Sequence, residues 1–176
     1  MNRHLARLAA AFGLSLLLAL PVSAVEPKEL AKTLPNDINL VQAQLVIEAA
    51  VAKAKEIKVP MNIALVDAGG NLKAFYRMDD AFLGSIDISQ KKAKTARYFN
   101  QSTKSFGEAS QVGKPLYGIE VTNDGLAIFA GGVLLINADN MIVGAVGVSG
   151  GSVEEDHAVA TAAADALMAG KAPAGQ

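Results

Sequence analysis

The stretch from Gly131 to Asp156, reading GGVLLINADNMIVGAVGVSGGSVEED, most constrains what this chain can fold into. Residues 133–136 and 141–148 are rich in β-branched side chains, as β-strands are. Asp139 and Asn140 between them tolerate the left-handed backbone that short hairpin loops need. We therefore expect a β-hairpin at the centre of an antiparallel sheet, followed directly by a helix.

Two glycines, Gly144 and Gly147, interrupt the second of these strands. A glycine inside a strand has no side chain, so the backbone of another element can approach it closely. The pair predicts tight packing of a second backbone, a helix or a flat ligand against this strand.

The remaining periodicities predict further helices and a second hairpin. Asn39 and Ser85 are placed as N-caps, and Ser152 with Glu155 makes a capping box. The expected elements are a helix over 40–58, strands over 61–67 and 72–78, a helix over 86–100, a short helix over 104–110, a short strand over 126–129, the opening hairpin and a final helix over 153–169. This order describes an α/β (α+β) fold, an antiparallel sheet with helices on both faces.

The first 24 residues have the features of a secretory signal peptide. Arg3, His4 and Arg7 precede an apolar run over 8–20, and Val22-Ser23-Ala24 is a small-residue cleavage site. The run is shorter than the roughly 20 residues that a membrane span requires. We expect a signal peptide over 1–24, a periplasmic or secreted protein without a membrane span after cleavage, an extended leader over 25–38, a single domain over 39–170 and a frayed tail over 171–176.

The composition excludes several classes of function. The formal net charge of −1 becomes −3 when Arg3 and Arg7 leave with the signal, which argues against nucleic acid as a partner. The chain has no cysteine, so disulfides, thiolate metal sites and a cysteine nucleophile are excluded. After cleavage His157 is the one histidine left, so a multi-histidine metal site would need several subunits or other ligands.

His157 is the first candidate for chemistry. It shares a face of the final helix with Val153, Ala160, Ala164 and Leu167. A lone histidine there is a packed core or interface residue, an axial ligand of haem iron, or a solvent-facing side chain near the helix start. The sequence alone leaves these three readings open.

Lys92 and Thr95 are the second candidates, because they share a helix face with Ile88 and Phe99. An amphipathic helix has no structural need for an ammonium and a hydroxyl on its inner face. A lysine can nevertheless snorkel, with its stem on apolar surface and its ammonium in water. A binding role and a structural role therefore both stand.

Two glycine-containing turns could hold an anion. Gly150-Gly151-Ser152 presents N–H groups at a helix N-terminus, which suits a carboxylate or phosphate, but the acidic residues after it also describe an ordinary capped helix start. Asp67-Ala68-Gly69-Gly70 lacks the helix and lysine of a P-loop, which favours a plain hairpin turn.

Ordered motifs recur along most of the chain. They are VDAGGNL at 66–72, Phe75, Arg77-Met78-Asp79, LGSIDI at 83–88, the KA and TA pairs at Lys92 and Thr95, PLYG at 115–118, GGV at 131–133 and VGAVGVSGG at 143–151. Together they resemble the GlcG/HbpS-like family, also called the domain of unknown function 336 or haem-degrading domain. The resemblance covers about residues 40–168.

This resemblance implies a profilin-like three-layer sandwich with a five-stranded antiparallel sheet, assembling into dimers and larger oligomers. Some members are exported haem-binding proteins, and others sit beside glycolate or diol metabolism. Carried over by motif, the residues along the pocket would be Lys92, Thr95, Tyr117, Gly131 and Gly132.

Together with the signal peptide, the resemblance favours an exported haem-binding (tetrapyrrole-binding) protein, in haem uptake, storage or sensing, over an enzyme. Thr95, Tyr117 or His157 would be the iron ligand, and Lys92 would meet a propionate. One alternative is a small-molecule enzyme or accessory protein of hydroxy-acid, glycolate or diol metabolism, suggested by Lys92 beside a glycine-rich turn. Another is a structural oligomer without a ligand.

Alanine almost encircles the final helix. The alanines are Ala158, Ala160, Ala162, Ala163, Ala164, Ala166 and Ala169. Such small residues permit close approach of a second subunit, although the high helix propensity of alanine is an alternative reason for them. We expect a homo-oligomer, at least a dimer, with this helix partly at an interface.

Overall fold

The computed structural model of the protein describes residues 36–170. Its elements are α2 (Leu40–Glu56), β1 (Asn62–Asp67), β2 (Leu72–Arg77), α3 (Ser85–Phe99), α4 (Thr103–Ala109), the 3-10 turn η1 (Ile119–Val121), β3 (Gly132–Ile136), β4 (Ile142–Ser149) and α5 (Val153–Ala169). Every predicted helix and both predicted hairpins are present, with ends moved by at most two residues. The predicted signal peptide, the leader up to residue 35 and the tail over 171–176 lie outside the described residues.

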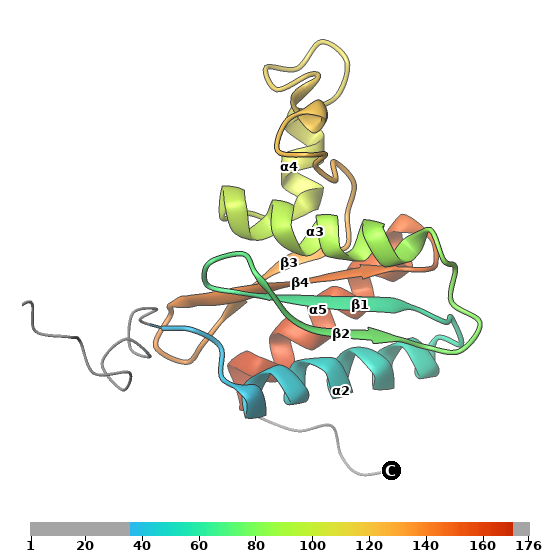
Figure 1. Ribbon diagram of the computed structural model, residues 1–176, viewed down its shortest axis with the longest axis vertical. Helices are drawn as coiled ribbons and strands as arrows, with labels where there is room; N and C mark the ends of the chain where they lie inside the picture. Colours follow the sequence, from blue (N-terminus) through green and yellow to red (C-terminus); the bar gives the residue numbers. More distant parts are fainter. Residues whose placement is uncertain (1–35, 171–176) are drawn as a thin grey trace, which may run out of the picture. The chain divides into compact units, whose positions relative to one another are not determined.

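The sheet has four antiparallel strands in the order β2-β1-β4-β3 (Figure 1). The expectation of five strands is therefore wrong for the part of the chain that is described, while the mixed α and β class is confirmed. The hairpin of β3 and β4 is also not wholly central, because β4 lies between β1 and β3 whereas β3 is an edge strand.

The predicted strand over 126–129 does not form, and its first two residues donate their N–H groups outside the sheet. Leu126 N–H bonds the Glu120 carbonyl oxygen at 2.9 Å, and Ala127 N–H bonds Thr95 Oγ1 at 3.0 Å. At the edge of β3, Gly132 N–H is taken by Thr103 Oγ1 at 2.8 Å. A strand needs such donors for a ladder, and this segment is bonded to α3 at Thr95 instead of pairing in the sheet.

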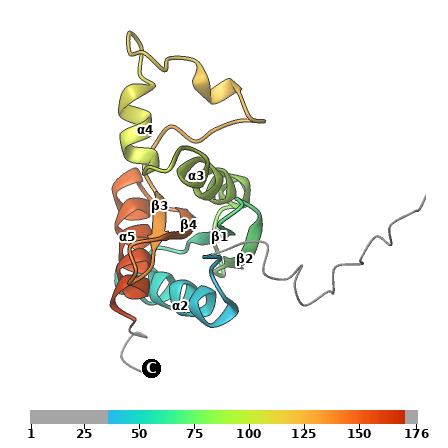
Figure 2. The ribbon, with the colours of Figure 1, turned by 90° about the vertical axis from the view of Figure 1, so that its left-hand side faces the viewer.

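Helices cover both faces of the sheet. In Figures 1 and 2, α2 and α5 lie side by side on one face, while α3 lies on the other with α4 beyond it. The larger core lies under α2 and α5 and contains Ile63, Leu65, Val146, Val148 and Val159 among others. The core under α3 is thin, because its buried members are mostly alanines.

The thin core lets α3 approach the sheet closely. A Cβ built on Gly147 of β4 would overlap the Ser89 carbonyl oxygen and the Ala93 nitrogen of α3. At Gly144 the overlapping atom would be the Val66 carbonyl oxygen of β1. The close backbone approach predicted from these two glycines is confirmed.

The start and the buried face of α3 differ from expectation. Gly84 is the N-cap without a side-chain bond, and Ser85 is the first helical residue rather than the cap. The inner face carries Lys92 and Thr95 as expected, but Ile88 and Phe99 are only partly buried. The reason is the small space above β4, which serine and alanine fill. The buried residues of the helix are Ser85, Ser89, Lys92, Ala93, Thr95 and Ala96.

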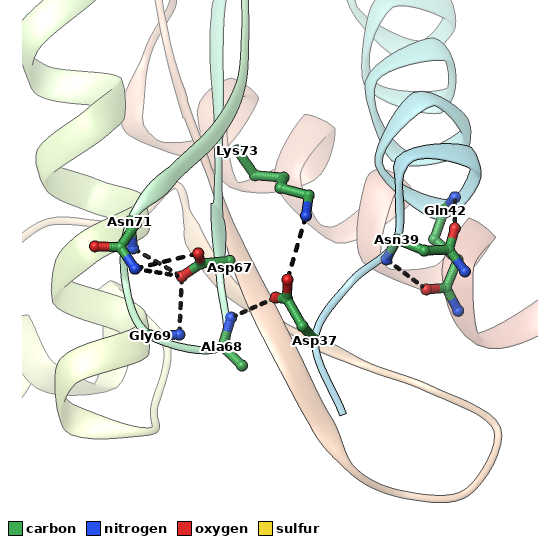
Figure 3. Close-up of polar contacts among 8 residues, drawn as sticks. All are labelled: Asp37, Asn39, Gln42, Asp67, Ala68, Gly69, Asn71 and Lys73. Carbon is green, nitrogen blue, oxygen red and sulfur yellow. Dashed lines mark hydrogen bonds and ion pairs between the residues drawn. The ribbon is translucent and has the colours of Figure 1, made fainter. Parts of the chain in front are cut away.

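The first described residues are fastened to the end of the sheet. Ile38 is fully buried and its N–H bonds the Val143 carbonyl oxygen at 3.1 Å. Asp37 accepts a hydrogen bond from Ala68 N–H at 3.1 Å and pairs with Lys73 at 3.2 Å (Figure 3). Among residues 36–170, no helix is long and apolar enough to cross a membrane.

Candidate functional site

Lys92 lies in a buried polar cluster between α3 and α5. Its side chain is 0% exposed, and Nζ donates to Asp156 Oδ2 at 2.6 Å and to the Val148 carbonyl oxygen at 3.0 Å. The Phe129 ring faces the same ammonium, with 4.6 Å between Nζ and the ring centroid. Burial lowers the pKa of Lys92, and the hydrogen bond and charge of Asp156 oppose that change. The lysine therefore does not snorkel to solvent.

Asp156 uses both of its carboxylate oxygens. Oδ2 meets Lys92, and Oδ1 accepts hydrogen bonds from Gly150 N–H and Gly151 N–H at 3.0 Å each. The N–H groups that the sequence marked as a possible anion site are thus bonded to the chain's own carboxylate. The capping box predicted at Ser152 and Glu155 is confirmed beside it.

Gly131 and Gly132 let the chain pass against Lys92. Gly131 has φ +119°, and a Cβ there would lie 2.7 Å from Lys92 Nζ. A Cβ on Gly132 would overlap the Lys92 carbonyl oxygen. Larger residues at these positions would push the start of β3 away from α3, so both glycines are required by the packing around the lysine.

Thr95 is buried one helical turn after Lys92. Its Oγ1 accepts the hydrogen bond from Ala127 N–H at 3.0 Å and so fixes the segment that leads to β3. Thr103 Oγ1 likewise accepts a hydrogen bond from Gly132 N–H and fixes the start of β3. The geometry gives both hydroxyls a structural partner.

His157 lines an open pocket of about 260 Å³ between α4 and α5. The apolar wall of this pocket is formed by Gly107, Ile128, Ala130 and Val153. The charged and polar residues at its rim are Lys104, Glu108, Gln111 and Glu154. Gly107 allows α4 to lie close to the backbone of Ile128, because a Cβ on Gly107 would overlap the Ile128 carbonyl oxygen.

One nitrogen of the His157 imidazole has no hydrogen-bond partner among the described residues. This nitrogen is Nδ1, and it is buried. Burial lowers the pKa of His157 first, and the positive charges of Lys104 and Lys92 lower it further. A neutral imidazole with an unused nitrogen is the form that ligates iron.

The predicted site residues do not all come together. Lys92, Gly131 and Gly132 meet around one ammonium, and His157 follows the carboxylate that pairs with it. Tyr117 is 63% exposed in the loop after α4 and does not line the His157 pocket. The site assignments from the sequence stay predictions.

Sequence reasoning missed Asp156 as the partner of Lys92. Its acidic neighbours made it look like an ordinary first-turn charge, whereas it is 2% exposed. A signal was present, because a lysine on an inner helix face needs a carboxylate and acidic residues follow the glycine turn. Phe129 and Lys104 carried no such signal.

The β1–β2 turn is not a phosphate loop. Asp67 Oδ1 accepts hydrogen bonds from Gly69 N–H and Asn71 N–H at 2.8 Å each (Figure 3). The Asn71 side chain donates to the same carboxylate. The turn's donors therefore point at its own aspartate, which supports the plain-turn interpretation.

A family model described as "Haem degrading protein HbpS-like" matches residues 38–165. The chain belongs to this HbpS-like family, and the resemblance to GlcG/HbpS-like proteins is confirmed. A protein of Citrobacter freundii, named only for its 15.0 kDa mass and its place in the dhaT-dhaS intergenic region, is 44% identical over 128 residues. The match covers 73% of this chain and 90% of that protein.

Two further relatives carry more specific names. The corrinoid adenosyltransferase PduO of Salmonella typhimurium is 33% identical over 149 residues, which are 85% of this chain and 44% of PduO. The chain thus corresponds to less than half of that enzyme. The protein in the crystal structure of a PduOC:heme complex is 35% identical in sequence to this chain. The two structures superimpose with a TM-score of 0.71, and the match covers 74% of this chain and 95% of that one.

Proposed function

We propose that this protein binds haem, with His157 as the protein ligand of the iron. The observation that carries the proposal is that His157, whose Nδ1 has no hydrogen-bond partner among the described residues, lines a pocket with an apolar wall. An apolar surface with one nitrogen donor is what a tetrapyrrole requires, because its face is apolar and its iron takes axial ligands. Bound haem would supply the iron chemistry.

The charges around the pocket limit how haem could lie. Lys104 is the cation at the rim and would meet a propionate, whereas Glu108 and Glu154 would repel one. The propionate role predicted for Lys92 passes to Lys104 in this proposal, because the Lys92 ammonium is enclosed and paired with Asp156. This uneven distribution of charge around the rim predicts one preferred orientation of the macrocycle.

Relatives add support. One solved neighbour is a complex with heme, and the matching family model carries haem in its description. These names belong to those proteins, and they make haem the tetrapyrrole to test first here.

Titration of the full chain with haemin tests the proposal. We expect a Soret band that saturates at one haemin per protein chain. Its low-spin component should disappear in His157→Ala. Tyr117→Phe is the matched control, because Tyr117 was a candidate ligand and does not line the pocket described above. It should leave the band unchanged.

An unchanged haemin spectrum at stoichiometric protein would refute haem binding. A normal spectrum in His157→Ala together with a lost band in Tyr117→Phe would refute the choice of ligand but not the binding.

The metabolic alternative has less support. A reactive Lys92 amine would need access for a substrate, but the side chain is fully buried and hydrogen-bonded. A structural oligomer without a ligand is the remaining alternative, and the haemin titration distinguishes it directly.

Export and assembly complete the proposal. The first 24 residues would direct the chain to the periplasm or outside the cell, and mass spectrometry of the exported protein should then begin at Val25. A homo-oligomer would cover the exposed side chains of the loop after α4, where Val112, Tyr117 and Val121 are mostly accessible. Light scattering that returned the monomer mass alone would contradict the assembly.

A further inference from the structure

The Lys92–Asp156 ion pair lies behind the pocket, and haem binding as proposed makes no direct use of it. The two residues are 64 positions apart in sequence. Their side chains link α3 to α5, with 2.6 Å between Lys92 Nζ and Asp156 Oδ2. Lys92 also bonds the Val148 carbonyl oxygen of β4, and Asp156 also bonds the N–H groups of Gly150 and Gly151 in the turn after β4. The ion pair therefore connects α3, α5 and the end of β4.

His157 directly follows this carboxylate in α5. Successive side chains of a helix point about 100° apart, so Asp156 faces the interior while His157 faces the pocket. The His157 Nδ1 has no hydrogen-bond partner among residues 36–170, so this nitrogen does not fix the ring. The place of the imidazole is then set by the α5 backbone, which is fastened at Asp156.

We propose that Lys92 and Asp156 are positioning residues for His157: their buried ion pair fixes the first turns of α5 and so fixes where the imidazole stands in the pocket. The inference rests on the proposed function, in which His157 holds the iron. Ligand orientation by groups that do not touch the metal is a general feature of metal sites.

A purely stabilising role for the pair must be separated from a positioning role. The double variant Lys92→Met/Asp156→Asn does this, because it removes both charges while the oxygen of the introduced amide can still accept from the N–H groups of Gly150 and Gly151. Replacing both members of a buried ion pair by uncharged groups often preserves stability. Lys91→Met is the matched control, since Lys91 pairs with the exposed Asp87 at 2.8 Å on the same helix.

We expect the folded double variant to keep a urea midpoint near that of the wild type but to bind haemin about 10-fold more weakly or worse. Its low-spin band should shrink in favour of a high-spin one. Lys91→Met should match the wild type in both measurements. If the double variant keeps both the wild-type urea midpoint and the wild-type low-spin haemin band, the pair is only structural and the inference is overturned.

A measurement without haem keeps this test separate from the proposed function. In the haem-free protein with 13C-labelled histidine, the His157 signal is identified by its loss in His157→Ala. It should be a single narrow line in the wild type and broad or multiple in the double variant. If haemin gives no His157-dependent band at all, the proposed function fails, and this signal still decides the positioning role.

A second variant covers the case in which the double variant does not fold. Asp156→Glu keeps the charge but lengthens the side chain by one methylene, so the ion pair can form only if the first turns of α5 shift. We expect the same broadened His157 line and the same loss of low-spin haemin. A wild-type line and band in folded Asp156→Glu would overturn the inference.

Discussion

Gly147 of β4 lies so close under Ala93 of α3 that a methyl group on the glycine would overlap the alanine nitrogen. This contact sets the distance between α3 and the sheet. Since Lys92 precedes Ala93, the same contact also sets how deep the lysine reaches toward Asp156.

Gly147→Ala should therefore lower the free energy of unfolding by about 1–3 kcal/mol, the usual effect of overpacking. The added methyl meets backbone atoms of Ser89 and Ala93, which cannot move without the whole helix. Gly84→Ala is the control, because it has φ −61° and open space around a built Cβ. Urea unfolding that gave equal losses for the two variants would contradict the prediction.

Lys92→Met should destabilise the fold by about 3–5 kcal/mol, because it leaves the Asp156 carboxylate buried without a cation. Lys91→Met removes a lysine whose side chain is 39% exposed, and its loss should be at most about 1 kcal/mol. Both values come from denaturant unfolding of the haem-free protein. Equal effects would show that burial of the Lys92 pair has no energetic consequence.

The stability of the haem-free protein should depend on pH through His157. Burial and the charges of Lys104 and Lys92 lower the pKa of His157 in the folded chain below its ordinary value of 6.5. The unfolded imidazole then takes up a proton at a higher pH than the folded one does. Stability is thus unaffected well above pH 6.5 and decreases as the pH falls from 6.5 toward the lowered pKa.

This prediction is checked by measuring the free energy of unfolding against pH for the wild type and for His157→Gln, which cannot titrate. The wild type should lose stability relative to the variant on the acid side of this window. Parallel curves across the window would contradict the lowered pKa.

Asp67→Ala should cost more stability than Asp37→Ala. Asp67 accepts two turn N–H groups and is nearly buried, so its removal leaves donors unsatisfied at about 1–3 kcal/mol. Asp37 accepts one backbone N–H and forms a partly exposed ion pair with Lys73 (Figure 3). Its removal should cost about 1 kcal/mol of stability. Thermal or urea unfolding of the two variants gives the order, and the reverse order would contradict it.

The sequence by itself determined the local elements of this protein. The N-cap residue Asn39, the capping box at Ser152 and the β-branched runs predicted helices and hairpins, because each signal acts within a few residues. It also marked Lys92 and His157 as unusual, since polar groups on inner helix faces need a partner or a purpose.

Only the tertiary structure decided which partners those residues have. Residues 126–129 were expected as a strand, but Thr95 takes the Ala127 N–H, and a side chain 32 residues away cannot be foreseen from local propensity. Asp156 meets Lys92 across 64 residues, and the pocket at His157 is lined by residues of both α4 and α5. Such contacts depend on how separate elements are placed in space, and hydrophobic periodicity along one segment carries no information about that placement.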